Sequence, residues 1–183
     1  KICNHFNISK FNFIEGLGSD YLIRDFLILF NEPENSKKKN IITYDLGYGM
    51  YSVYTKGLNY NLSYFDYEID TSSEEIYLTN KEKLFSQIYE NEIIVITNPN
   101  QISNYDISLE EIDELCNKYS DKIFLIDEVY FGYGCFTTIE LTKKYKNIYV
   151  IRSASKEFGL ACIRFGILFG HKDTLKFFKN ISS

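Results

Sequence analysis

Short runs of apolar residues alternate with amphipathic segments along most of the chain. Four runs contain almost no polar interruption, and such runs predict strands that are buried on both faces of a sheet. They cover residues 92–97, 122–126, 147–151 and 165–169, and two weaker runs cover residues 40–44 and 60–65. Strands that alternate with helices are typical of a mainly parallel sheet with helices packed on it. We therefore predict an α/β fold.

Segments with helical spacing of apolar residues lie between these runs. The clearest opens with a capping box formed by Ser108 and Glu111 and extends to about residue 119. An earlier helix is expected to run from a cap at Ser19 or Asp20 to about residue 30. Further helices are predicted at residues 49–55, 81–89, 139–145 and 173–180.

The composition narrows the class of protein. A chain of 183 residues suits one large domain, and at that length folding buries roughly 70% of the exposed surface. The 25 acidic and 20 basic side chains give a net charge of −5, which provides no footprint for nucleic acid or an anionic membrane. The longest apolar stretch, residues 21–30, is too short to span a bilayer. We expect neither partner.

The four cysteines, Cys3, Cys116, Cys135 and Cys162, lie far apart, with no Cys-x-x-Cys pair among them. This spacing predicts neither a zinc site nor a disulfide framework. Scattered reduced thiols are typical of a cytoplasmic protein, which is our expectation for this chain. Because the chain begins with Lys1 and not with methionine, we treat it as a candidate fragment.

Polar side chains follow three of the predicted strands. Residues 92–97 lead into Asn98 and the turn after it, residues 122–126 into Asp127 and Tyr130, and residues 147–151 into two serines followed by Lys156. Each group alone is more often a turn, packing or surface residue. Ligands of open α/β sheets bind beyond the carboxyl ends of the parallel strands. If these strands are neighbours, the three groups converge on one crevice and predict a site.

A glycine segment at residues 16–20 directly precedes the first predicted helix, so its N–H groups can bind an anion at the positive end of the helix dipole. It lacks the third glycine of a dinucleotide fingerprint, and we expect no strong strand before it. The chain contains no P-loop motif. With only His5 and His171, neither beside a candidate nucleophile, a histidine-dependent triad is disfavoured.

Residues 152–166 resemble the cofactor-lysine segment of pyridoxal-phosphate aminotransferases of the aspartate aminotransferase fold, class I and II, and most of all that of histidinol-phosphate aminotransferases. The resemblance implies a three-layer α/β/α sandwich with a mainly parallel sheet. It also implies that Lys156 binds the cofactor covalently and that Arg164, eight residues later, holds the cofactor's phosphate.

Other segments agree with this resemblance in order. Asp127 and Tyr130 are similar to the pair that holds the pyridine nitrogen and the ring oxygen. Tyr48, the first residue of a Tyr-Gly-Met-Tyr segment, resembles the tyrosine that stacks on the ring. Gln101 stands where the family has an asparagine that meets the ring oxygen, and its side chain is one methylene longer. The remaining phosphate contacts implied are Gly18, Ser19, Asp20, Ser153 and Ser155.

The resemblance covers residues 15–180 and implies that the chain, residues 1–183, is a single cofactor-binding large domain, without the family's N-terminal arm and C-terminal small domain. It implies a pyridoxal-phosphate-dependent aminotransferase that is a homodimer, takes glutamate as amino donor, acts on a polar or phosphorylated keto substrate, and uses Lys156, Asp127 and Tyr130 in catalysis. Two alternatives stay open: a decarboxylase of a phosphorylated amino acid, and a non-catalytic domain of the same fold.

Overall fold

A computed structural model describes residues 12–33, 36–72, 75–78, 81–100, 107–134 and 136–178. Its main feature is a seven-stranded sheet with the order β1-β9-β8-β7-β6-β2-β3. The strands are β1 (Phe13–Leu17), β2 (Lys39–Thr43), β3 (Tyr60–Tyr64), β6 (Ile93–Thr97), β7 (Ile123–Asp127), β8 (Ile148–Ser153) and β9 (Phe165–Gly170). All six predicted strands are therefore present.

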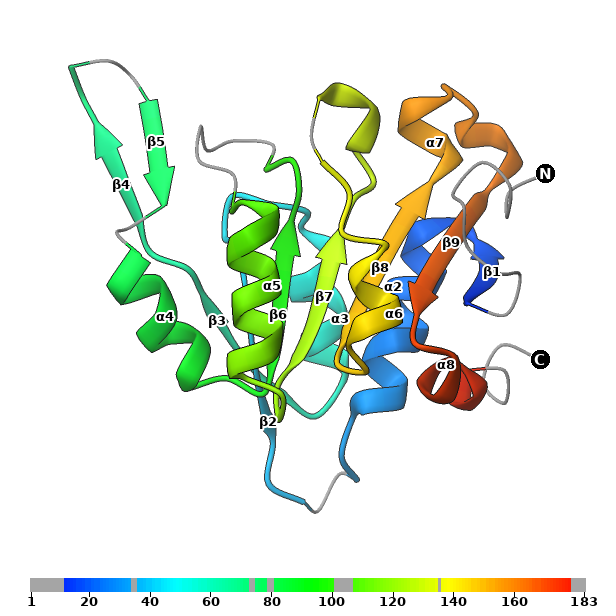
Figure 1. The fold of residues 1–183 in the computed structure, drawn as a ribbon, viewed down its shortest axis with the longest axis horizontal. Helices are drawn as coiled ribbons and strands as arrows, with labels where there is room; N and C mark the ends of the chain where they lie inside the picture. Colours follow the sequence, from blue (N-terminus) through cyan, green and yellow to red (C-terminus); the bar gives the residue numbers. More distant parts are fainter. Residues whose placement is uncertain are drawn as a thin grey trace.

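The sheet is mainly parallel, as predicted. Strands β2, β3, β6, β7 and β8 pair in parallel, whereas β9 runs antiparallel to both of its neighbours, β8 and β1. The three strands that end in polar groups, β6, β7 and β8, are adjacent and point the same way (Figure 1). Their carboxyl ends therefore meet at one edge, which is the condition for the predicted site.

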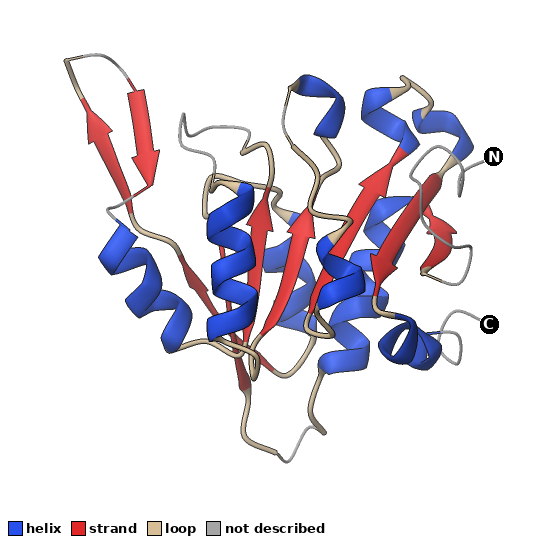
Figure 2. Ribbon diagram, in the orientation of Figure 1, coloured by secondary structure: helices blue, strands red, loops and turns tan. Residues whose placement is uncertain are grey.

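Helices cover both faces of the sheet (Figure 2). One face carries α2 (Gly18–Phe30), α3 (Met50–Gly57) and α8 (Lys172–Phe178), and the other carries α4 (Lys81–Tyr89), α5 (Leu109–Lys118) and α6 (Leu141–Lys144). Along β6, Ile94 and Ile96 join one apolar core while Ile93 and Val95 join the other. This alternation within an all-apolar strand confirms the three-layer α/β/α sandwich.

The capping box at the start of α5 is confirmed. The Ser108 hydroxyl accepts from the Glu111 N–H at 3.2 Å, and the Ser108 N–H donates to the Glu111 carboxylate at 3.0 Å. Ile112 and Leu115 lie on the inner side of this helix and are fully buried. The local sequence and the tertiary packing therefore agree on where this helix begins and which face it buries.

The start of α2 differs from the prediction. The helix begins at Gly18, its N-cap is Leu17, and no side-chain hydrogen bond caps it. The predicted cap at Ser19 or Asp20 is wrong because both residues lie inside the first turn. The Asp20 carboxylate is engaged by Tyr48 and Arg164, which lie outside the helix.

A short strand, β1, stands directly before the glycine turn, where the sequence predicts no strong strand. β1 forms the edge of the sheet and pairs antiparallel with β9. A dinucleotide-binding unit requires a parallel strand at this place, so β1 adds nothing to that interpretation. The other elements that the sequence did not predict are the hairpin of β4 (Tyr67–Asp70) and β5 (Glu75–Leu78), the short helix α7 (Ala154–Glu157), and the 3₁₀ turns η1 (Phe131–Tyr133) and η2 (Ala161–Ile163).

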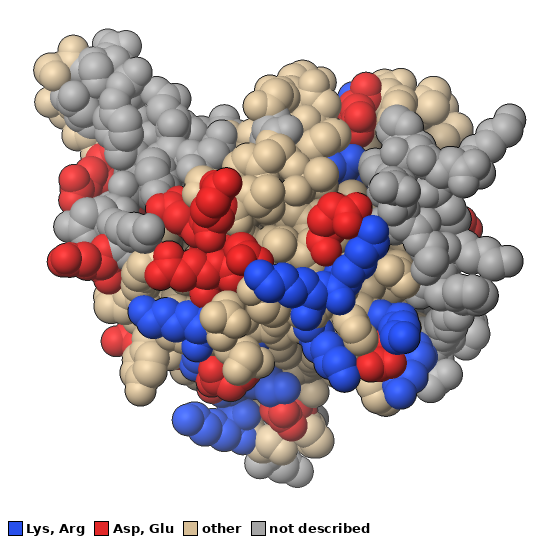
Figure 3. All heavy atoms as spheres, in the orientation of Figure 1, with Lys and Arg blue, Asp and Glu red and all other residues tan. Residues whose placement is uncertain are grey.

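The surface carries both signs of charge. On the face drawn in Figure 3, acidic and basic side chains are interspersed. Two of the surface pairs are Lys143 with Glu140 and Lys144 with Asp113. Among the helices of the described ranges, none is long and apolar enough to cross a membrane.

Candidate active site

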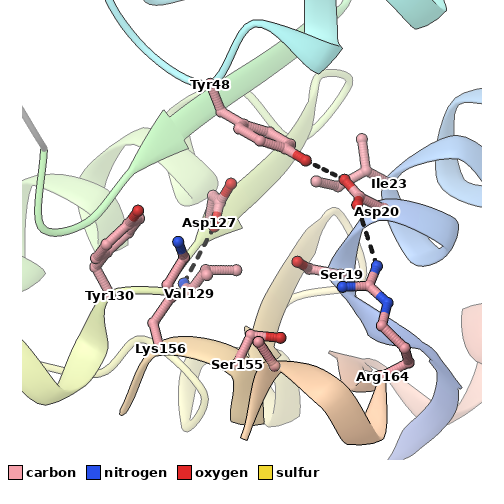
Figure 4. Close-up of a pocket in the computed structure, with 11 residues that line it drawn as sticks. Ser19, Asp20, Ile23, Tyr48, Asp127, Val129, Tyr130, Ser155, Lys156 and Arg164 are labelled. Atoms are coloured by element: carbon pink, nitrogen blue, oxygen red, sulfur yellow. Dashed lines mark hydrogen bonds and ion pairs between the residues drawn. The ribbon is translucent and has the colours of Figure 1, made fainter. Parts of the chain in front are cut away.

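A cavity of about 200 Å³ lies at the carboxyl edge of the parallel strands. It is larger than the ~150 Å³ cavities that admit benzene, so a small aromatic ligand can enter it. The first turn of α2, the segment after β2, the ends of β7 and β8, and the turn before β9 surround it (Figure 4). The lining residues are Ser19, Asp20, Ile23, Tyr48, Asp127, Val129, Tyr130, Ser155, Lys156, Ala161 and Arg164.

Asp127 ends β7 and brings a buried carboxylate to this cavity. One oxygen, Oδ1, accepts from the Val129 N–H at 3.1 Å, and the other, Oδ2, accepts from the Tyr51 hydroxyl at 2.9 Å. Burial raises the pKa of Asp127 to about 6, and these two hydrogen bonds oppose the rise. The carboxylate is thus held in place on both oxygens, and its charge is sensitive to pH near neutrality.

The raised pKa of Asp127 predicts a pH-dependent stability. Because the folded-state pKa of about 6 exceeds the ordinary value of about 3.9, this carboxyl favours folding most below about pH 4. Its contribution is lost as the pH rises through about 6, by roughly 3 kcal/mol for a shift of about two units. Urea denaturation from pH 4 to 7 is expected to show this fall in the wild type and not in Asp127→Asn.

Asp113 provides the control for that titration. Its hydrogen bond from Lys144 lowers the pKa of its carboxyl, so its stabilising effect is lost as the pH falls, the opposite direction. Asp113→Asn is therefore expected to keep the fall between pH 4 and 7. A wild type and an Asp127→Asn variant whose stabilities run parallel over that range would contradict the assignment.

Lys156 and Tyr130 lie beside Asp127. Lys156 belongs to α7, the short helix after β8, and its ammonium nitrogen lies 5.3 Å from the centre of the Tyr130 ring. The start of α7 is fixed by Ser153, whose hydroxyl accepts from the Ser155 N–H at 3.1 Å. In this way β8 delivers an amine to the same cavity as the carboxylate of β7.

The opposite end of the cavity lies at the start of α2. The first turn of this helix carries no side-chain cap, and an uncapped helix start offers N–H groups at the positive end of the helix dipole. Arg164 adds a guanidinium there, and its Nη2 lies 3.2 Å from Asp20 Oδ2. Figure 4 shows Asp20 between Arg164 and the Tyr48 hydroxyl, which donates to Asp20 Oδ1. Burial and the hydrogen bond to Asp20 raise the pKa of Tyr48, so this phenol stays protonated.

Two glycines allow this close packing. A Cβ at Gly166 would lie 2.5 Å from the backbone of Gly18, so only a glycine lets β9 approach the start of α2. Gly18 itself has a φ of +84°, and a Cβ there would meet Arg164 Nη2 at 2.8 Å. A side chain at either position would push the helix or the guanidinium out of place.

A buried ion pair joins two residues that are sequence neighbours of Asp127 and Ser153. Arg152 donates through two nitrogens to Glu128 Oε2, at 3.0 and 2.8 Å, and its guanidinium lies 3.5 Å from the centre of the Phe131 ring. Thr137 and Thr138 donate to the same carboxylate. Because Glu128 follows Asp127 and Arg152 precedes Ser153, this pair links the ends of β7 and β8.

The structure brings together most of the predicted site residues. Those that line the cavity are Ser19, Asp20, Tyr48, Asp127, Tyr130, Ser155, Lys156 and Arg164. Gly18 lies against Arg164, while Ser153 is buried and its hydroxyl caps α7. Gln101 lies outside the described residues.

Sequence reasoning missed four residues of this region. Ile23, Val129 and Ala161 line the cavity, and Tyr51 reaches the Asp127 carboxylate from behind. Only Tyr51 carried a signal, because it stands three residues after Tyr48, one helical turn away in the same segment. The three apolar residues are ordinary packing residues in the sequence.

Comparison with known proteins identifies the relatives of this chain. The family Aminotransferase class I and II matches residues 14–183. The histidinol-phosphate aminotransferase of Clostridium beijerinckii is 30% identical over 179 residues, which cover 96% of this chain and 46% of that protein. The histidinol-phosphate aminotransferase of Lactococcus lactis is 34% identical over 163 residues, 87% of this chain and 41% of that protein. The chain thus spans about half the length of the curated relatives it matches.

Solved structures show the same fold. The histidinol-phosphate aminotransferase of Sinorhizobium meliloti in complex with pyridoxal-5'-phosphate superposes with a TM-score of 0.82 at 21% identity, over 98% of this chain and 48% of that one. The L-threonine-O-3-phosphate decarboxylase of Porphyromonas gingivalis gives a TM-score of 0.79 at 16% identity, over 100% and 54%. Together, the sheet, its crevice and the matched profile establish that this chain belongs to the class I and II aminotransferase family.

Proposed function

We propose that this chain is the cofactor-binding large domain of a pyridoxal-phosphate-dependent aminotransferase. The observation that carries the proposal is the convergence of Asp127, Lys156 and Arg164 on one cavity from three different places in the sheet. A carboxylate can pair with the protonated ring nitrogen of this cofactor, an amine can react with its aldehyde, and a guanidinium can bind its phosphate. The intact set of three also speaks against a non-catalytic domain of the same fold.

The residues present fit the cofactor at both ends. Arg164 and the N–H groups that begin α2 form a cup for a phosphate, and Tyr48 offers a ring face next to it. Asp127 is held on both oxygens and can pair with a protonated ring nitrogen. The cavity of about 200 Å³ accepts one small aromatic ring. When bound, pyridoxal phosphate supplies an electron sink for carbanion chemistry.

Each side chain then has a definite task. Lys156 Nζ would anchor the cofactor, and as a free amine it would take the proton from the substrate's α-carbon. The Asp127 carboxylate would keep the ring nitrogen protonated, and the Tyr130 hydroxyl would donate to the ring oxygen. Ser155, together with Arg164, would hold the phosphate. Gln101 is proposed as a second donor to the ring oxygen.

The test is to incubate the chain with an equimolar amount of pyridoxal phosphate, reduce with borohydride and map the modified peptide by mass spectrometry. Modification confined to Lys156 supports the proposal, with Lys156→Ala as the blank. Pyridoxal without the phosphate is the matched ligand control, and it is expected to label Lys156 far less. Labelling spread over surface lysines, or none on the folded chain, would overturn the proposal.

Arg164→Lys is expected to weaken cofactor retention about ten- to a hundredfold. Lysine keeps the charge but loses the planar two-nitrogen grip, which costs roughly one charge-assisted hydrogen bond. Equilibrium dialysis with pyridoxal phosphate measures the change. Lysine is smaller than arginine, so the variant does not crowd Gly18, which packs against the guanidinium. Retention equal to that of the wild type would remove Arg164 from the phosphate site.

Transamination is the activity we propose, because the matched relatives are histidinol-phosphate aminotransferases. We further propose glutamate as the donor and a polar or phosphorylated keto compound as the acceptor. The fold neighbour that decarboxylates L-threonine-O-3-phosphate supports decarboxylation as the second candidate. Both begin with the same cofactor anchoring and differ in which bond of the substrate breaks. Incubation with an amino acid distinguishes them, because one releases a keto acid and the other carbon dioxide.

We also propose a homodimer. Beside the cavity, Phe158, Leu160 and Ile163 expose about half of their apolar side chains in one short segment. Contiguous exposed apolar residues of this kind mark surfaces that other protein segments cover. Sedimentation equilibrium at micromolar concentration is expected to give twice the mass of the chain, and a monomer at every concentration would contradict the dimer.

A further inference from the structure

The side chain of Tyr51 ends on the back of the candidate active site. It lies in the first turn of α3 and is 1% exposed. Its ring packs edge-on against the Tyr48 ring, with 6.1 Å between the two ring centres. Its hydroxyl donates to Asp127 Oδ2 at 2.9 Å, across 76 residues of sequence. Tyr48 and Tyr51 therefore share one turn, with Tyr48 lining the cavity and Tyr51 reaching the carboxylate from the apolar core between α3 and the sheet.

The direction of this hydrogen bond is fixed. Burial and the neighbouring Asp127 raise the pKa of Tyr51 well above its ordinary value, so the phenol keeps its proton and acts as a donor. A donated hydrogen bond favours the charged form of a carboxylate. It acts against the burial of Asp127 and against the nearby Glu128 and Asp20, which all favour the protonated form.

Another tyrosine of the same core shows what a purely structural hydroxyl does. Tyr60 is buried on the same face of the sheet, and its hydroxyl donates to the backbone carbonyl of Leu27 at 2.7 Å. That arrangement satisfies a buried phenol without involving any ionisable group. Tyr51 instead donates its hydrogen bond to the Asp127 carboxylate, which lines the cavity. The Val129 N–H donates to the other oxygen of that carboxylate.

We propose that Tyr51 is a positioning residue: its hydroxyl keeps the Asp127 carboxylate charged and aimed into the cavity at the ring nitrogen of the cofactor. The ring-nitrogen part rests on the proposed function, whereas the effect on Asp127 itself does not. A carboxylate oxygen has more than one acceptor position, so Asp127 can accept from Tyr51 and from the ring at the same time.

The first test needs no cofactor. Carbon-13 NMR of the aspartate carboxyl groups, with Asp127 assigned through Asp127→Asn, gives its pKa in the wild type and in Tyr51→Phe. We expect that pKa to rise by about one unit in Tyr51→Phe, because one stabilising donor is lost. Tyr60→Phe, which also removes a buried hydroxyl, is expected to leave it unchanged. An unchanged Asp127 pKa in Tyr51→Phe overturns the proposal.

The second test addresses the ring nitrogen. Tyr51→Phe is expected to bind pyridoxal phosphate about tenfold more weakly, and to bind the analogue with carbon in place of the ring nitrogen as well as the wild type does. An equal loss for both ligands would show a merely structural role. If the wild type binds neither ligand, the proposed function and the ring-nitrogen part fail together, while the NMR titration still decides the effect on Asp127.

If Tyr51→Phe does not fold, the wild type provides the answer. In mixed H₂O and D₂O, the Tyr51 hydroxyl is expected to give an isotope shift at the Asp127 carboxyl carbon, because the two are joined by a hydrogen bond. The absence of that shift overturns the proposal.

Discussion

Lys156→Ala is expected to lose about a thousandfold or more of any amino-transfer rate while it keeps its fold. Among the described residues that line the cavity, Lys156 alone carries an amine that can lose its proton and attack an aldehyde. Its side chain is exposed at the cavity, so truncation leaves no void in the core. Rapid mixing of the cofactor-loaded protein with glutamate, followed by absorbance, measures the rate, and thermal melting measures the fold.

Lys172→Ala is the matched control for this loss. Lys172 is equally exposed but lies on α8, away from the cavity. It is expected to keep the full rate and the full borohydride labelling of Lys156. A Lys156→Ala protein that turned over at more than about a tenth of the wild-type rate would remove Lys156 from proton transfer, whatever its part in anchoring.

Arg152→Leu is expected to lower the free energy of unfolding by about 3–5 kcal/mol. Arg152 and Glu128 are 5% and 0% exposed, and removal of one partner leaves the other charge buried in a medium of low polarity. The hydroxyls of Thr137 and Thr138 keep donating to Glu128, yet they carry no charge. Guanidinium denaturation followed by circular dichroism measures the loss.

The surface pair of Lys143 and Glu140 provides the comparison. Lys143 Nζ lies 2.8 Å from Glu140 Oε2, the same distance as in the Arg152–Glu128 pair, but both side chains are exposed. Lys143→Ala is therefore expected to lower the free energy of unfolding by less than about 1 kcal/mol. Changing Arg152 to Leu and Glu128 to Gln together is expected to recover part of the loss, since no buried charge remains. Equal costs for Arg152→Leu and Lys143→Ala would contradict the importance of burial.

The central strands of the sheet and the start of α5 can be predicted from short segments of the sequence. Strands β6, β7 and β8 are apolar on both faces, and a run such as that of Ile93–Thr97 can satisfy this environment only as a central strand. The capping box of Ser108 and Glu111 is likewise a contact between neighbours in sequence. These features needed no knowledge of the rest of the chain.

The features that the sequence did not predict depend on distant partners. β1 is a short edge strand with a glycine and a glutamate, and only its pairing with β9 makes it a strand. Ser19 and Asp20 look like helix caps, but Asp20 is drawn into contacts with Tyr48 and Arg164. Local propensity is the weaker influence where a charged partner lies across the fold.

Some residues of the candidate site can likewise be predicted from the local sequence, whereas the roles of others depend on distant partners. Asp127 and Lys156 could be predicted because each follows a recognisable strand, and the rule for the edge of parallel sheets places them together. The role of Tyr51 could not, because its partner lies 76 residues away and a phenol on an amphipathic helix is ordinary packing. The resemblance implies Ser153 as a phosphate contact, and in the structure its hydroxyl caps α7.

Because β9 runs antiparallel to β8, the two cationic residues of the site, Lys156 and Arg164, lie in one connection between adjacent strands. β8 leaves the sheet at Ser153 and β9 re-enters it at Phe165, with Ser153 paired to Gly166, so residues 154–164 form one closed loop between adjacent strands. Lys156 and Arg164 both lie on that loop. Closing so short a loop costs little chain entropy. The spacing between amine and guanidinium is therefore a property of loop length, and a one-residue deletion within residues 157–163 would misplace one cation while leaving the seven strands intact.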